Sequence, residues 1–445
     1  MADRSGGVGV SGAILQDYVA TSRDAGAGAP WLSALRQAGL DRFQAAGFPS
    51  TRDEDWRFLN LAPITGTSFR VADTDAAGVT RAALAPFLYP IPGVITLVFV
   101  NGRFAPALSD RHALPRGITL QPLAAALAAE GELVRRHLGQ YATPVQSGFT
   151  ALNTAFVADG LFLRVSRDTV LEAPVHAVFV THPGADGVAT HPRNLILVER
   201  GARAAVIESY VSLGQSAYLT NAVTEAVVED GAYLEHTKIQ RESERAFHVG
   251  TTHIRQGRDS RGLSFSVSFG AAICRNNLDV VLDGPGIEAQ MLGLYMGRDR
   301  QEVDNHTSLL HAHPNCGTRE VYKGILDDRS HGVFNGKIYV TPEAQKTDAK
   351  QTNRALLLSD TARIDTKPQL EIFADDVKCT HGATVGALDQ ASAFYLKSRG
   401  IGGALARKIL TYAFAAEVLE EIPYEPVRAA LEAVVMSRLE ARAEG

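Results

Sequence analysis

Cysteine is scarce in this chain: its 445 residues include only Cys274, Cys316 and Cys379. The three lie far apart in the sequence and cannot form a disulfide framework, which agrees with a reducing compartment. They are also too few to hold an iron–sulfur cluster by four thiolates within one chain. Cysteine usage therefore favours an intracellular protein that binds no cluster stably on its own.

Long apolar runs and basic runs are missing too. No stretch could span a bilayer, although 45% of the residues are hydrophobic. The N-terminal MADRSGGVGVSGAILQDY has acidic residues where a targeting peptide needs basic ones, so we expect a cytoplasmic protein. A net charge of −5 without a Lys/Arg run argues against nucleic acid and points to proteins or small molecules as partners.

Common catalytic motifs are absent. The sequence has no GxSxG, HExxH or P-loop pattern, and GVGVSG lacks the preceding strand and the glycine spacing of a dinucleotide site. Asp375 and Asp376 could serve as the acid and base of a β-helical carbohydrate-active enzyme. Adjacent strand residues point to opposite faces, however, and Asp is common in turns. We therefore expect a chain without catalysis of its own and keep the carbohydrate-active enzyme as an alternative.

What the sequence does contain is helical periodicity at both ends with β-type runs between them. Near the N-terminus, Trp31, Leu35 and Phe43 fall on one helical stripe. The run VITLVFVNGRF is typical of a strand that ends in an Asn-Gly turn. Residues 1–150 are therefore predicted to form an N-terminal domain that is mixed and mostly helical.

Residues 151–388 contain short β-type runs cut by Gly, Asp and Asn at a nearly constant interval. In GLSFSVSFG, apolar residues alternate with serines, which predicts a strand with one buried face. Steps of 30 to 31 residues over about 230 residues predict a β-solenoid of roughly eight coils, with a β-sandwich or barrel as the alternative. Those runs begin at Gly201, Gly231 and Gly262, and again at His331 and Thr361.

Residues 389–445 return to helical periodicity. Leu405, Ile409 and Tyr412 recur at i, i+4 and i+7, and Pro423 ends the first helix of a pair. Such a pair either caps the last coil or offers an apolar face to another protein. From the residues alone, capping is the favoured interpretation.

Four candidate metal ligands lie within HTSLLHAHPNC: His306, His311, His313 and Cys316. In an extended chain His311 and His313 face the same way and could hold Zn²⁺. The spacing matches no established zinc pattern. A self-contained zinc protein is therefore an alternative, and structural roles are the default.

The stretch VKCTHGATVGALD places Val377, Cys379 and His381 on one face of an extended chain. Cys379 is expected in the core, because free cysteine is commonly buried. Gly382 allows the chain to turn, so the His381 imidazole is expected to point outward. Two candidate ligands do not complete a metal site, and the missing ligands would come from another chain.

The segment KPQLEIFADDVKCTHGATVGALDQASAFYLKSRGI resembles the SufD branch of the SufB/SufD family of iron–sulfur cluster assembly proteins. YKGILDD, HGVFNGKIYV and EAQKTDAKQTNRALLLSD upstream resemble the pattern that both branches share. SufB-type sequences carry an EHEA-like segment where this chain has CTHGAT. The Glu54-Asp55-Trp56-Arg57 segment is also similar to SufD, so the resemblance is to SufD rather than to SufB.

This resemblance implies a right-handed parallel β-helix over 151–388 with helical domains on both sides. It also implies a complex with one SufB and two copies of the ATPase SufC, in which the C-terminal helical domain, 389–445, docks one SufC. The docking candidates are then Leu405, Ile409 and Tyr412, and the chain is a non-catalytic scaffold.

By the same resemblance, His381 matches the SufD histidine that faces a SufB cysteine and takes part in forming the nascent cluster. Cys379 matches a neighbouring position. The implied metal is a transient iron–sulfur cluster or iron shared with SufB. Flavin is associated with some Suf complexes, but no residue pattern here assigns a flavin contact. The isolated chain is expected to be able to form a homodimer.

Overall fold

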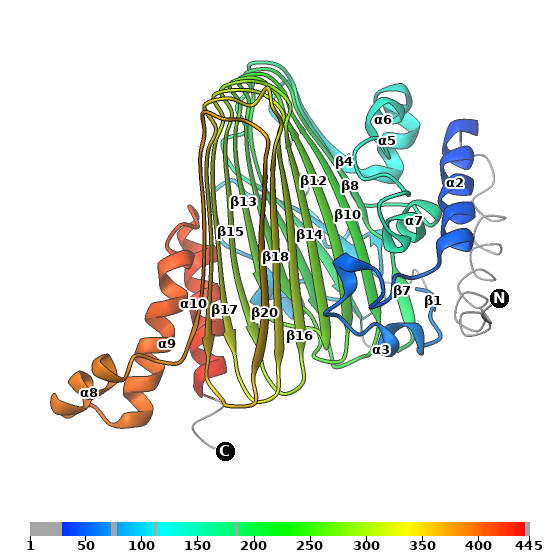
Figure 1. Ribbon diagram of the computed structural model, residues 1–445. Helices are drawn as coiled ribbons and strands as arrows, with labels where there is room; N and C mark the ends of the chain where they lie inside the picture. Colours follow the sequence, from blue (N-terminus) through cyan, green and yellow to red (C-terminus); the bar gives the residue numbers. More distant parts are fainter. Residues whose placement is uncertain (1–28, 73–77, 111–113, 183–185, 441–445) are drawn as a thin grey trace, which may run out of the picture.

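The computed structural model describes residues 29–72, 78–110, 114–182 and 186–440. The chain forms a β-solenoid of about eight turns with helices towards both ends, which confirms the predicted β-helix (Figure 1). In the described part of the chain, no helix is long and apolar enough to cross a membrane.

From β8 onward, successive strands alternate between two sheets and strands of neighbouring coils pair in parallel, whereas β2–β3 and β4–β5 near the start are antiparallel pairs. Sheet A is ordered β20 (Arg363–Ile372), β18 (His331–Val340), β16 (Glu302–His311), β14 (Ile273–Leu282), β12 (Phe247–Gln256), β10 (Leu219–Val228), β8 (Arg193–Val198), β5 (Leu161–Val165) and β4 (Ile118–Pro122), with β7 (Val188–Thr190) beside β10 and β1 (Arg70–Val71) beside β7. Sheet B is ordered β21 (Lys378–Gly386), β19 (Asp348–Leu357), β17 (Gly317–Leu326), β15 (Glu288–Gly297), β13 (Arg261–Ser268), β11 (Tyr233–Arg241), β9 (Arg203–Ser212), β6 (Val175–Thr181), β2 (Ile95–Val100) and β3 (Arg103–Phe104).

The register between coils is less regular than the sequence period. Gly262 pairs with Leu234 rather than with Gly231, where the preceding run begins. His331 pairs with Arg363 rather than with Thr361, where the following run begins. The strands of the later coils keep nearly the same length, and the turns between them absorb the difference. The predicted steps therefore give the approximate coil length but not the residue pairs.

Strand β13 is buried on both faces, so the prediction of a single buried face is wrong. Phe265 and Val267 belong to the apolar cluster that includes the C-terminal helices. Ser264 and Ser268 are also buried, and Ser268 Oγ accepts a hydrogen bond from Asn276 Nδ2 of the opposite sheet at 3.0 Å. The serines thus line the solenoid interior, and helices cover the apolar outer face.

Most of the N-terminal helices lie on the far side of the solenoid from the C-terminal ones (Figure 1), whereas the short helical segment at residues 81–87 packs on sheet B. In the first N-terminal helix, Phe43 is buried while Trp31 and Leu35 are partly buried against a neighbouring cluster, so the predicted stripe faces the protein. These helices are α2 (Pro30–Ala46), α3 (Ala62–Thr65), α4 (Arg81–Leu84), α5 (Leu123–Ala129), α6 (Gly131–His137) and α7 (Gly148–Ala155), with 3-10 turns η1 (Glu54–Trp56) and η2 (Ala85–Phe87).

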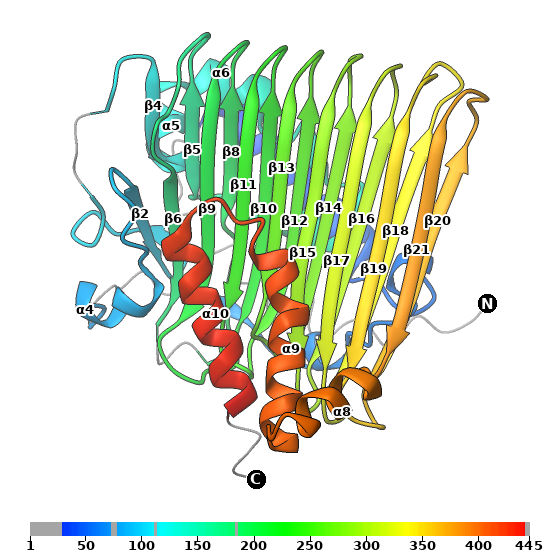
Figure 2. The same cartoon turned by 90° about the vertical axis from the view of Figure 1, so that its left-hand side faces the viewer.

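The C-terminal helices do not cap the last coil. After the short α8 (Gln390–Ser398), α9 (Gly403–Leu419) and α10 (Glu425–Glu440) lie side by side along the outside of sheet B (Figure 2). Buried residues such as Leu419 and Leu431 pack there with Leu292 of β15. The outer face of these middle strands is apolar, so burying it stabilises the fold more than covering a polar end would. The capping interpretation is wrong.

Candidate functional site at the open end of the solenoid

The solenoid is open at its last coil, because β20 and β21 are the terminal strands of sheets A and B. Among the described strands, each of these two has a paired neighbour on one side only. In a parallel ladder, successive residues direct their backbone groups to opposite neighbours. Lys378 donates its N–H to Thr347 O at 2.8 Å, so its backbone groups point to β19. Every second residue after Lys378 points the same way, and the residues between them point to the opposite side. The backbone groups of Cys379, His381 and Ala383 therefore face the open edge, where another chain could pair with them.

The neighbouring edge of β20 is less suited to pairing. Arg363 donates its N–H to Ser330 O at 3.0 Å, and Phe373 donates to Val340 O at 3.0 Å. Pro368 falls on the alternate set, which faces the open edge, and it has no N–H to offer. Proline is tolerated on edge strands and blunts them. The intact pairing edge of this coil is therefore β21.

Side chains of Cys379 and His381 share one face of β21, as the sequence predicts. Cys379 is half-buried and packs against the cluster that fills the solenoid interior. Burial raises the pKa of its thiol above the ordinary value. His381 is exposed, and no side chain in the described ranges hydrogen-bonds its ring. The structure thus places an accessible imidazole at the rim and a protonated thiol beneath it.

Buried polar side chains lie in line with His381 on the preceding strands of sheet B, away from the open end. The register partner of His381 on β19 is Gln351, and the partner of Gln351 on β17 is Glu320. Gln351 Nε2 donates to Glu320 Oε2 at 2.7 Å, and both side chains are at most 2% exposed. Burial raises the pKa of Glu320 to about 7. Sequence reasoning missed both residues, because they line up with His381 only once the register is known.

The docking candidates on α9 divide between two environments. Leu405 is 53% exposed and Ile409 is 38% exposed, whereas Tyr412 is partly buried against the cluster beneath the helices. The preceding α8 adds Phe394 and Tyr395, at 73% and 57% exposed. These four exposed residues, Leu405, Ile409, Phe394 and Tyr395, form what we call the α8–α9 apolar set. Sequence reasoning missed its two aromatic members, although the adjacent Phe-Tyr in a mostly polar helix is a usable signal.

The histidine-rich segment does not gather around a common point. His311 is buried in the interior with Nε2 3.2 Å from Thr318 Oγ1, and burial lowers its pKa to about 4. His313 lies near the surface, 3.5 Å from Asp283. The Cys316 thiol is buried and donates to the Gly284 carbonyl at 3.3 Å. Across the residues that the structure describes, no group of three or more such side chains could hold a metal ion.

His306 and the acidic pair also have local partners. His306 Nε2 lies 3.1 Å from Asp304 Oδ1, on the outside of sheet A. Asp375 and Asp376 lie in the turn between β20 and β21, and Asp376 forms an ion pair with Lys346. A turn position with a lysine partner is the solvated role that the sequence favoured for these aspartates.

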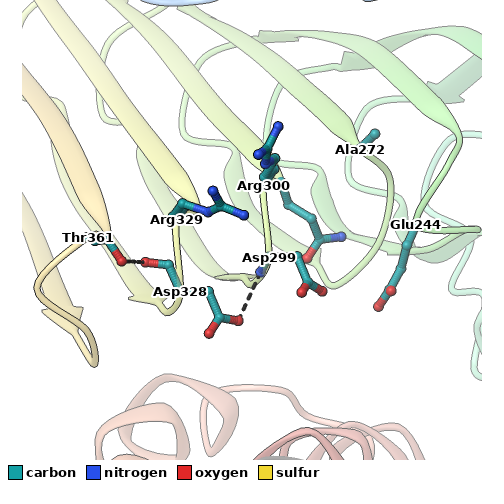
Figure 3. A pocket seen from close by; sticks show the side chains of 8 residues that line it. Glu244, Ala272, Asp299, Arg300, Asp328, Arg329 and Thr361 are labelled. Carbon is teal, nitrogen blue, oxygen red and sulfur yellow. Dashed lines mark hydrogen bonds between the residues drawn. The ribbon is translucent and has the colours of Figure 1, made fainter.

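A hollow of about 680 Å³ lies at the turns between the sheets, and Figure 3 shows the charged residues that line it. The backbone N–H of Asp299 donates to the Asp328 carboxylate at 3.1 Å, and the Thr361 hydroxyl donates to the Asp328 carbonyl. Asp299 and Asp328 both have positive φ, at 53° and 51°. Asp tolerates that conformation in tight turns, so these contacts tie successive turns together.

Fold and site together define a class: a β-solenoid protein with helical flanks and an end coil whose outer strand edge is unpaired and suited to association with another chain. Comparison with protein families narrows this class. Residues 179–414 match the "SUF system FeS cluster assembly, SufBD core domain" model, and residues 22–177 match the "SufBD protein N-terminal region" model.

Curated relatives agree. An iron–sulfur cluster assembly SufBD family protein of Synechocystis is 36% identical over 91% of this chain and 90% of its own length. The iron–sulfur cluster assembly protein SufD of Escherichia coli is 32% identical over 92% and 93%, and SufD of Bacillus subtilis is 27% identical over 96% and 98%. The chain belongs to the SufBD family of iron–sulfur cluster assembly proteins. The predicted resemblance to SufD is confirmed.

The buried Glu320 predicts a pH-dependent stability difference between the wild type and Glu320→Gln. Below its ordinary pKa of 4.5 the carboxyl is neutral in both the folded and the unfolded state. Between pH 4.5 and about 7 only the unfolded carboxyl is ionised, so the wild type loses stability as pH rises. The variant should therefore gain on the order of 3 kcal/mol relative to the wild type from pH 4 to pH 8.

Urea unfolding of both proteins at pH 4, 6 and 8 measures this difference. Glu343→Gln, at an exposed turn position, is the control for the loss of one carboxyl. An unfolding free-energy difference that stays constant across the three pH values would contradict the raised pKa of Glu320.

Proposed function

We propose that this chain is the non-catalytic, SufD-type scaffold of a SufBCD iron–sulfur cluster assembly complex. In that complex it pairs with SufB through the open end of the solenoid, and a nascent cluster forms between them. The observation that carries the proposal is the exposed His381 on the intact pairing edge of β21. Family membership and the SufD relatives support it.

The chemistry of the open end suits a shared iron site. A neutral imidazole binds iron well, and a thiolate from a partner supplies a softer ligand for the same metal. His381 offers half of such a site at a place where strand pairing would bring the partner's residues close. Cys379 is less suited than His381 to bind the incoming iron, because burial raises the pKa of its thiol and keeps it protonated at neutral pH. The cluster is then cargo that the two subunits assemble, and the described residues suggest no place for flavin.

ATP hydrolysis is assigned to the partner SufC, because this chain carries no P-loop pattern. The α8–α9 apolar set is the surface we assign to SufC. Large apolar side chains such as Phe394 and Leu405 are rarely exposed together without a partner. Helices docked on sheet B would pass motion of the ATPase to the solenoid and so to its open end. We also expect the complex to be cytoplasmic, and the isolated chain to be able to pair with itself by the same edge.

The first test is His381→Ala. Because His381 makes no side-chain hydrogen bond in the described structure and is exposed, the variant should fold and bind SufB and SufC normally. It should nevertheless abolish cluster maturation in cells that depend on this system, measured as the activity of an iron–sulfur reporter enzyme.

His313→Ala removes another accessible histidine, remote in sequence, and is the matched control. Wild-type maturation by the His381 variant, together with normal expression, would remove His381 from the mechanism.

The second test is the double variant Leu405→Ser/Ile409→Ser. Both side chains are already exposed, so the unfolding free energy should change by less than about 0.5 kcal/mol. Co-purification should lose the ATPase subunit and keep the SufB partner. Retention of the ATPase at wild-type stoichiometry would exclude these residues from its docking surface.

A further inference from the structure

We propose that Gln351 is a positioning residue for His381: the structure shows no hydrogen bond between the two side chains, but the Gln351 carbonyl is placed to accept the N–H of one imidazole nitrogen and so leave the other nitrogen free for iron. The inference rests on the proposed function of His381 and adds a residue beneath it. Imidazoles that bind metals usually donate their second nitrogen to such an acceptor, which fixes the tautomer and the ring orientation.

The first support is an unused acceptor at the right place. Gln351 is 2% exposed, and its Oε1 has no hydrogen-bond partner among the described residues. A buried amide oxygen without a donor is costly, so such atoms call for an explanation. The register places Gln351 directly beside His381 in the parallel ladder, where neighbouring strands lie about 4.8 Å apart.

The second support is that the Gln351 amide is held in one orientation. Its Nε2 donates to Glu320 at 2.7 Å, so the oxygen is the atom left over. Gly336 of β18 packs against the same amide: a Cβ added at Gly336 would clash with Gln351 Nε2 and would lie 2.8 Å from Phe334 Cζ. Glycine at this position gives the amide the room that it occupies.

The third support is the contrast with the next interior position of the same strand. Asn353 is 1% exposed, donates from Nδ2 to Thr366 at 2.9 Å and also has an unpaired carbonyl oxygen among the described residues. Its register partner is Ala383, which has no side-chain group to donate. Two equally buried amides thus differ in whether a ring nitrogen lies beside them, and this makes Asn353 the matched control.

The experiment compares Gln351→Met and Asn353→Leu in the full chain labelled with ¹⁵N-histidine. Long-range proton–nitrogen spectra report which ring nitrogen of His381 carries the proton, and His381→Ala assigns its signals. In the wild type one neutral tautomer should dominate. Gln351→Met should shift the population towards the other tautomer, whereas Asn353→Leu should leave it unchanged. Because both variants remove a buried amide, a purely structural role of Gln351 would not separate them.

The second readout is cluster maturation in cells. Gln351→Met should lower it by roughly 10-fold, as loss of an outer hydrogen-bond partner typically does at metal sites, with SufB and SufC still bound. Asn353→Leu should stay near the wild type. An unchanged tautomer population in Gln351→Met would overturn the inference, and so would wild-type maturation by that variant while His381→Ala is inactive. Normal maturation by His381→Ala is a separate result: it defeats the proposed function itself.

Discussion

Parallel in-register pairing between coils is the constraint on which the rest of this structure depends. Each coil hydrogen-bonds to the backbone groups of the coil before it, so every added coil leaves a new set of backbone groups without partners. The last coil therefore always has an unpaired edge. Here pairing stops at β20 and β21 without a described helix across the end. Unpaired strands are a liability that proteins blunt or use. Pro368 blunts one edge, and β21 keeps the other intact with His381 on it.

The two faces of sheet B are used differently. Its outer face is apolar in the middle coils and is buried by α9 and α10, which fixes those helices to the solenoid body. Its inner face carries polar side chains in several coils, and the column from Glu320 through Gln351 extends this polarity to the open end. The same strands therefore hold the helical domain on the outside and support the rim on the inside. Sheet B therefore connects the surface that we assign to the ATPase with the edge that we assign to SufB.

The sequence predicted more of the fold than of the site. A nearly constant interval between β-type runs predicts the solenoid. The outward turn expected of His381 at Gly382 is wrong: β21 stays paired through Gly382, and His381 keeps the face that it shares with Cys379. His381 is exposed because no further coil follows β21. The register is not predictable from that interval, because turns of different length move the partner of Gly262 from Gly231 to Leu234. The serines of β13 resemble a solvated face, and only tertiary packing shows that they line a polar interior. Gln351 and Glu320 were missed for the same reason: a whole coil of chain separates each from its register partner towards the rim.

Hydrogen exchange at the last coil tests the open-edge account most directly. The amides of Lys378 and Thr380 point to β19, whereas those of Cys379, His381 and Ala383 point to the open side. In the dilute chain the first set should exchange slowly and the second set quickly. Addition of SufB should protect the second set and leave the first unchanged. If the outward amides stay unprotected in an intact SufB complex, the open edge of β21 is not the assembly surface.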